Sequence, residues 1–134
     1  MVVGENLKRI GSIGFKPVGK WKLVEGKLDF DLFDEPESAN ILYAFVVDSE
    51  VMYIGKTDRG LRSRMLNYRN AHVSQTTNTR NNEGLVKCLL QKQSVEIYGL
   101  STDGLFQYGG FHINLAAGLE DSLIDELKPP WNVN

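Results

Sequence analysis

Alternation of apolar and polar positions marks the first quarter of the chain as a β-hairpin. Between Lys8 and Phe33, apolar residues alternate with charged ones on both sides of the dipeptide Glu25-Gly26. Such alternation is typical of half-buried strands, and the dipeptide favours a turn. The polar, proline-containing connector 34–40 follows it. We therefore expect an N-terminal hairpin extension over residues 1–39 that is separate from a core unit over residues 40–134.

The strongest strand pair follows the connector. Residues 41–47 and 51–54 are rich in β-branched and aromatic side chains and are separated by the polar residues 48–50. Pairing across a three-residue loop places Tyr43 opposite Gly55 and Tyr53 opposite Phe45, so that both tyrosines lie on one face. A one-residue slip would send the two rings to opposite faces.

The remaining pattern is mostly helical. Helical spacing of apolar residues predicts helices over 60–69, around 85–90 and over 116–127. Alternation predicts a strand over 95–100, and the polar residues 72–82 predict an exposed loop or a helix entry. Residues 101–115 fit a strand and a loop equally well. Pro129-Pro130 ends the last helix, and an extended tail with Trp131 and Asn132 follows. The predicted fold is α+β, with the order β-β-α-α-β-α after the hairpin.

Composition narrows the class of protein. The chain has 134 residues, of which 42% are hydrophobic and 24% charged, so one compact globular domain is expected and disordered, collagen-like or coiled-coil structures are excluded. No apolar run is long enough for a membrane span, and no signal-peptide core is present, which predicts a protein without membrane contact. The single cysteine, Cys88, cannot form an internal disulfide, and with His72 and His112 it makes no zinc set, which favours a cytoplasmic location.

The net charge of −2 hides a strong asymmetry along the sequence. Residues 1–55 hold six Lys/Arg and nine Asp/Glu, residues 56–92 hold eight and two, and residues 93–134 hold one and six. A polyanion would be repelled everywhere except at the central segment. That segment is either a phosphate-binding surface or an ordinary solvated basic helix.

Glu120 is the acid that needs an explanation. On a helical wheel of the last helix it falls inside the apolar arc, where an ionised carboxylate requires a partner. Its partner is either a cation from the basic segment, such as Lys56, Arg59, Arg62 or Arg64, or a divalent metal ion. A carboxylate beside cations and tyrosines is also what metal-assisted phosphodiester hydrolysis requires.

The tyrosines of the strand pair allow two interpretations. Tyr43 and Tyr53 are common strand residues and can simply pack in the core. A tyrosine positions or deprotonates water only if cations or a metal favour the phenolate, and Lys56 next to Gly55 is placed to help. The chain has no phosphate-binding loop, dinucleotide motif, serine-hydrolase elbow or zinc-protease motif.

These residues together resemble the GIY-YIG nuclease superfamily. Leu42-Tyr43, then Tyr53-Ile54-Gly55 ten residues later, the run 61–65 with Arg64, and Glu120 in a helix before Pro129-Pro130-Trp131-Asn132 match that pattern in order. The match covers roughly residues 40–132. The first motif lacks the usual glycine, and one extra residue near Arg59 leaves a choice between Arg62 and Arg64 as the catalytic arginine, of which we choose Arg64.

The resemblance implies a three-stranded antiparallel sheet flanked by helices, and hydrolysis of DNA with one Mg²⁺ or Mn²⁺ ion. In that scheme Tyr43 and Tyr53, assisted by Lys56, position or activate water, while Arg64 stabilises phosphate charge. Glu120 binds the metal and Asn132 supports the site.

The predicted function is therefore a metal-dependent DNA endonuclease with one active site per chain and a possible homodimer. DNA contacts are expected from Arg59, Arg62, Arg69, Arg80 and Lys87 in the basic segment. The alternatives are a non-catalytic nucleic-acid-binding module on the same scaffold, and a protein-interaction domain in which Glu120 pairs with Arg64.

Overall fold

A computed structural model describes residues 4–37, 39–71, 76–102 and 107–132. The elements are α1 (Glu5–Ser12), β1 (Lys16–Val24), β2 (Lys27–Leu32), β3 (Ile41–Val47), β4 (Glu50–Thr57), α2 (Leu61–Arg69), α3 (Thr76–Leu90), β5 (Val95–Ser101), β6 (Gln107–Tyr108), β7 (Phe111–His112) and α4 (Leu115–Leu127). In this part of the chain no helix is long and apolar enough to cross a bilayer.

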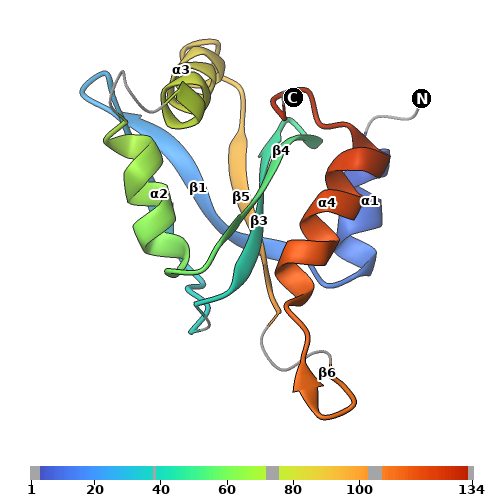
Figure 1. The fold of residues 1–134 in the computed structure, drawn as a ribbon. Coiled ribbons are helices and arrows are strands. Elements are labelled where there is room, and N and C mark those ends of the chain that lie inside the picture. The colour runs from blue at the N-terminus through green and yellow to red at the C-terminus, as the bar shows by residue number, and fades with distance from the viewer. Residues whose placement is uncertain (1–3, 38, 72–75, 103–106, 133–134) are drawn as a thin grey trace.

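The core is a five-stranded sheet in the order β2-β1-β5-β3-β4, and every neighbouring pair is antiparallel. Helices α2 and α3 cover one face, and α1 and α4 cover the other (Figure 1). Strand β3 is buried at all of its positions because helices cover both of its faces. Strand β4 forms one edge of the sheet, so that the two helical layers meet beside it.

The expected three-stranded sheet with an appended hairpin is wrong. The hairpin β1-β2 continues the main sheet, because β1 pairs with β5 over Lys16↔Gly99 to Lys20↔Glu96. Its Trp21 and Phe30 belong to the same buried cluster as Tyr43 and Phe45 of β3. Alternation along the chain identifies a hairpin but does not show which strand it will pair with.

One further helix was not expected. Residues 5–12 form α1, a short polar helix whose apolar side chains Leu7 and Ile10 lie three residues apart and pack on the same core cluster. Residues 76–82 belong to α3, so the helix entry is the correct one of the two alternatives for this segment, and 72–75 lie outside the described residues. In α3 the buried face is formed by Asn78, Asn81 and Leu85, so amides occupy positions where apolar residues would have revealed the helix.

The predicted register of β3 and β4 is confirmed, although the turn differs. Tyr43 pairs with Gly55 and Phe45 with Tyr53. The turn has two residues, Asp48 and Ser49, both with positive φ, instead of three. A bulge between Phe45 and its neighbour supplies the missing residue and restores the register.

Candidate active site

A polar cleft lies beside the edge strand, between the N-terminal half of α2 and the start of α4. Its volume is about 350 Å³, and we call it the site cleft. Three cationic residues, Lys56, Arg59 and Arg64, line it. Its other lining residues are Asn40, Thr57, Asp58, Ser63, Asn67, Asn114 and Ala116. The excess of positive charge makes the site cleft suited to an anionic group.

Arg64 is held by two phenols at the wall of the site cleft. Its Nε donates to Tyr43 Oη at 3.1 Å, and its Nη2 donates to Tyr68 Oη at 3.0 Å. The two phenolic oxygens are hydrogen-bonded to each other at 2.6 Å. The guanidinium carbon also lies 4.2 Å from the centre of the Tyr68 ring. The side chain is fixed by neutral partners, so its charge is oriented but not cancelled.

The two strand tyrosines lie on the same face, as predicted. Tyr43 and Tyr53 belong to one buried cluster, with ring centres 6.3 Å apart. Tyr43 is 1% exposed and Tyr53 is 9% exposed, and the Tyr53 ring stacks on Phe45. Tyr43 therefore reaches the site cleft through Arg64, whereas Tyr53 lies nearer the surface.

Burial controls the protonation of these phenols. Desolvation raises the pKa of Tyr43. Desolvation also raises the pKa of Tyr68, and the neighbouring Tyr43 and Tyr53 add to that shift. The charge of Arg64 opposes both shifts only in part. Both phenols stay neutral at physiological pH. As neutral groups they act as hydrogen-bond partners of Arg64.

Gly55 is required where the Tyr43 ring crosses the edge strand. A Cβ at this position would lie 2.5 Å from Tyr43 Oη and 3.0 Å from the Tyr53 ring. No side chain fits this space, because non-bonded heavy atoms need at least 3 Å. The neighbouring Lys56 is exposed and, by alternation, lies on the opposite face of β4, toward α4.

Glu120 comes from α4, which packs against β4 on the other side of the sheet. Burial raises the pKa of its carboxyl group, an effect that the Lys56 ammonium and a hydrogen bond from the Lys56 backbone only partly offset. Among the ion pairs of the described residues, none joins Glu120 to Arg64. The structure thus brings Glu120 to Lys56, which lines the site cleft, although Glu120 itself is not a lining residue. The alternative of a Glu120–Arg64 bridge is wrong.

A divalent ion fits Glu120 only as a single protein ligand. Within the described ranges, no group of three or more His, Cys, Asp or Glu side chains could hold a metal ion. Mg²⁺ commonly takes one or two carboxylates and completes its shell with water and phosphate oxygens. The donor set is therefore compatible with an ion that is held jointly by Glu120 and a phosphate substrate.

Asn132 binds the edge strand. Its Oδ1 accepts from Ile54 N–H at 2.9 Å, and its Nδ2 donates to Ile54 O at 2.8 Å. The preceding Trp131 N–H donates to Met52 O at 2.8 Å. The tail thus pairs with the outer side of β4 and fixes the strand that carries Tyr53, Gly55 and Lys56. Asn132 thus contacts the backbone of the edge strand, and its support of the site stays a prediction.

The five basic residues expected to contact DNA do not gather in one place. Arg59 lines the site cleft, whereas Arg80 and Lys87 are exposed on α3 and do not line it. Arg62 pairs with Glu35 through two hydrogen bonds of 2.9 and 3.3 Å. Arg69 pairs with Asp29. Their contacts with DNA stay predictions.

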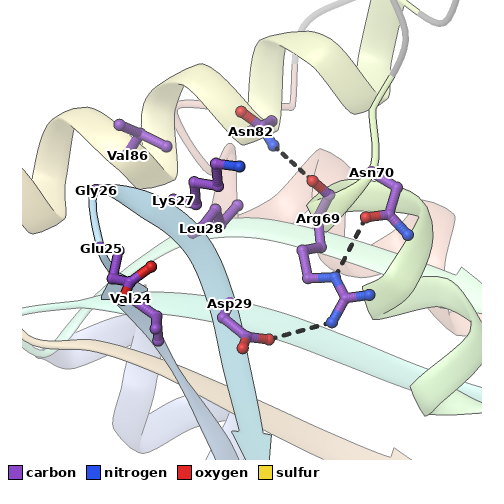
Figure 2. Close-up of a pocket in the computed structure, with 10 residues that line it drawn as sticks. All are labelled: Val24, Glu25, Gly26, Lys27, Leu28, Asp29, Arg69, Asn70, Asn82 and Val86. Carbon is purple, nitrogen blue, oxygen red and sulfur yellow. Dashed lines mark hydrogen bonds and ion pairs between the residues drawn. The ribbon is translucent and has the colours of Figure 1, made fainter.

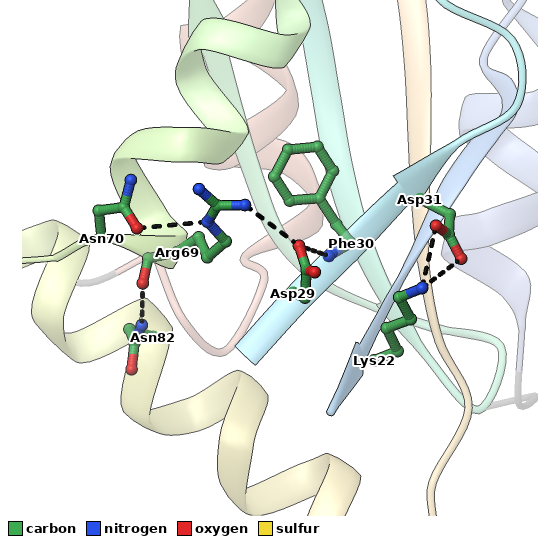
Figure 3. A network of polar contacts seen from close by, with 7 residues as sticks. All are labelled: Lys22, Asp29, Phe30, Asp31, Arg69, Asn70 and Asn82. Atoms are coloured by element: carbon green, nitrogen blue, oxygen red, sulfur yellow. Dashed lines mark hydrogen bonds and ion pairs between the residues drawn. The ribbon is translucent and has the colours of Figure 1, made fainter. Parts of the chain in front are cut away.

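Arg69 closes a polar network that joins three elements (Figure 3). Its Nη1 lies 3.3 Å from Asp29 Oδ1, and Asn82 of α3 donates to its carbonyl at 3.4 Å and to that of Tyr68 at 2.8 Å. These contacts surround a larger pocket of about 610 Å³ between the β1-β2 turn, the end of α2 and α3, which we call the hairpin pocket (Figure 2). Its arginine is already paired with a carboxylate.

Tyr68 is the functional residue that sequence reasoning missed. It is fully buried in α2, and the predicted set of site residues does not include it. The signal for its role is its spacing of four residues from Arg64, which places the two side chains on one face of α2.

Comparisons with known proteins identify a related endonuclease. No family model matches the chain. Endonuclease II of Enterobacteria phage T4 is 30% identical over 103 residues, which cover 73% of this chain and 75% of that protein. A solved structure of a glutamate-to-alanine mutant of bacteriophage T4 EndoII has a TM-score of 0.73 at 24% identity and covers 96% of this chain and 100% of that chain. The restriction endonuclease HPY188I in complex with product DNA has a TM-score of 0.56 at 15% identity and covers 90% of this chain and 78% of that chain.

These comparisons correct the family inferred from the sequence. The matched proteins are described as endonuclease II and a restriction endonuclease, and the sheet shared with them has five strands in this chain, not the three implied by the resemblance. The GIY-YIG assignment is therefore withdrawn.

Proposed function

Since the chain belongs to the endonuclease II family, we propose that it is a metal-dependent endonuclease that hydrolyses DNA phosphodiester bonds in the site cleft. The observation that carries this proposal is Arg64, a guanidinium fixed by two neutral phenols in a cleft that also contains Lys56 and Arg59. A positioned but uncompensated positive charge is what a phosphate needs as its charge increases toward the transition state.

Each side chain has a distinct part in the proposed reaction. Arg64 donates to a non-bridging phosphate oxygen, and Tyr43 and Tyr68 hold it in place. Tyr53, at the edge of the aromatic cluster, orients the attacking water through its hydroxyl. Lys56 and Arg59 bind the flanking backbone. Glu120 would hold the divalent ion, which when bound offsets charge on the phosphate and on the leaving oxygen.

One cleft cuts one strand, so double-strand cleavage requires a homodimer or two successive nicks. The homodimer, the cytoplasmic location and the division into a 1–39 extension and a 40–134 nuclease domain remain predictions. Because Trp21 and Phe30 of the hairpin share a core cluster with Tyr43, we expect residues 40–134 alone to lose stability.

A plasmid nicking assay tests the function. The wild-type chain should convert supercoiled DNA to open circles in Mg²⁺ or Mn²⁺ and should be inactive in EDTA. Glu120→Gln and Arg64→Ala should bind DNA without nicking it. Nicking in EDTA would contradict the metal requirement. Binding without nicking by the wild-type chain would favour the alternative, a non-catalytic nucleic-acid-binding module.

A further inference from the structure

A small β-hairpin stands out from the body of the molecule below the start of α4 (Figure 1). We call it the aromatic arm, residues 107–112. It consists of β6 and β7, joined by Gly109 and Gly110, which both have positive φ, at 59° and 80°. Two consecutive residues of this kind make a tight two-residue turn that suits the twist of a hairpin. The arm therefore has a defined shape at its tip.

Two aromatic rings lie on one face of the arm. Tyr108 pairs directly with Phe111, and residues opposite each other in an antiparallel pair lie on the same face. Tyr108 is 78% exposed and Phe111 is 77% exposed. Single exposed apolar residues are ordinary, but two large rings placed side by side on a projecting turn indicate a surface that binds something.

The arm is joined to the site cleft through Asn114. Ile113 joins it to Asn114, which caps α4 by accepting from Ala117 N–H at 3.2 Å and also lines the cleft. Any duplex that places a phosphate beside Arg64 must extend past its rim. Residues 93–134 are acidic as a whole, but residues 107–119, which include the arm, carry no Asp, Glu, Lys or Arg. A polyanion is thus not repelled at this point.

Resting on the proposed function, we infer that the aromatic arm is a DNA wedge, which stacks Tyr108 or Phe111 against bases of the duplex held in the site cleft. Aromatic and apolar wedges partly unstack a base step and bend the duplex, and they need only one or two rings. A second copy of the chain suits the arm less well, because a stable dimer buries about 800 Å² on each partner and two rings supply far less.

The experiment measures base unstacking. Duplexes with 2-aminopurine at successive positions are titrated with the Glu120→Gln chain, which should bind without cutting, and with the same chain carrying Tyr108→Ala and Phe111→Ala. We expect a fluorescence increase at one or two positions near the nick, its loss in the arm variant, and about tenfold weaker binding. Thermal unfolding should be unchanged, because both rings are exposed. Phe33→Ala, which removes another exposed aromatic ring (66% exposed), is the matched control and should leave fluorescence and affinity unchanged.

The outcomes separate the two proposals. If the wild-type chain nicks DNA but the arm variant keeps full fluorescence and affinity, the wedge is wrong and the endonuclease stands. If the wild-type chain neither binds nor nicks DNA, the endonuclease fails and the wedge fails with it. If sedimentation shows that the arm variant turns a dimer into a monomer with fluorescence unchanged, the arm is a self-association surface instead.

Discussion

The two ends of α2 lie beside two different polar hollows, each with an arginine. In the site cleft, Arg64 is hydrogen-bonded to neutral phenols. In the hairpin pocket, Arg69 is paired with the carboxylate of Asp29. A hydrogen bond from the Phe30 backbone N–H lowers the pKa of Asp29 most, and Arg69 lowers it further. The hairpin pocket is larger, at about 610 Å³ against about 350 Å³. Charge compensation, and not size, distinguishes a site that can bind phosphate from one that joins secondary-structure elements.

The largest expected difference between the two hollows comes from their arginines. Arg64→Ala removes the oriented donors and should lower the single-turnover nicking rate by about 10³-fold, the scale of losing one transition-state donor. Arg69→Ala removes a half-exposed ion pair and should cost at most about 1 kcal/mol of stability while nicking continues. Single-turnover rates and thermal unfolding of both variants provide the measurement.

A folded Arg64→Ala protein that nicks within tenfold of the wild-type rate would contradict the comparison. So would a folded Arg69→Ala protein that has lost its activity, because the hairpin pocket would then take part in the reaction.

Glu120 gives the next effect, which depends on pH. Because burial raises the pKa of this carboxyl, its ionised form is disfavoured in the folded state. The cost to stability is absent below the ordinary value of 4.5 and is complete above the raised folded pKa. Glu120→Gln should reduce the nicking rate by about 10²-fold or more. At neutral pH the variant should therefore still unfold at or above the wild-type temperature.

The pH profile of nicking sharpens this test. Wild-type activity should fall on the acid side as the Glu120 carboxyl gains a proton and releases the divalent ion, and this acid limb should move to lower pH as the Mg²⁺ concentration rises. Asp121→Asn changes the exposed neighbour on α4 and serves as the control, with the same activity and only a small shift of the acid limb. An acid limb that survives in a residually active Glu120→Gln protein belongs to another group.

Gly55, which lies against the Tyr43 ring, and Gly26, which lines the hairpin pocket, give a smaller contrast. Gly55→Ala places a Cβ 2.5 Å from Tyr43 Oη and should cost about 1–3 kcal/mol as the ring moves, with nicking reduced about tenfold because Arg64 moves with it. Gly26→Ala strains a turn with a φ of 77° and should cost about 1 kcal/mol without changing the nicking rate of the folded protein. Denaturant unfolding and single-turnover rates measure both. Equal rates for the two variants would show that Tyr43 does not position Arg64.

Features of the fold could be predicted from the sequence where they depend on residues that are close together along the chain. The face shared by Tyr43 and Tyr53, helix α2 and helix α4 with Glu120 all follow from periodicity within a few residues. The register was correct although the turn was assigned one residue too many, because a bulge offset the error. The pairing of β1 with β5 joins segments about eighty residues apart, and no local pattern carries that information.

Within the candidate site, residue types were easier to predict than their partners. Glu120 was identified as an acid that needed a partner, and Lys56 was one of four candidates for it. The hydrogen bonds of Arg64 to Tyr43 and Tyr68 were not predicted. Side-chain partners depend on how the layers pack around β4. The two faces of an edge strand can be assigned from sequence only after the sheet order is known.

The smallest expected effect concerns the cations that bind without touching the reacting phosphate. Arg59 lines the site cleft, whereas Lys27 lines the hairpin pocket. If Arg59 contacts one phosphate, Arg59→Ala should weaken DNA binding a few-fold and reduce the slope of log K against log salt by about 1, because one fewer counterion is released. Lys27→Ala should leave the slope unchanged. Titrations between low and moderate salt with the Glu120→Gln chain measure both without cleavage. Equal slope changes for the two variants would mean that DNA runs over the hairpin pocket as well, and the distinction between the two ends of α2 would then hold for catalysis but not for binding.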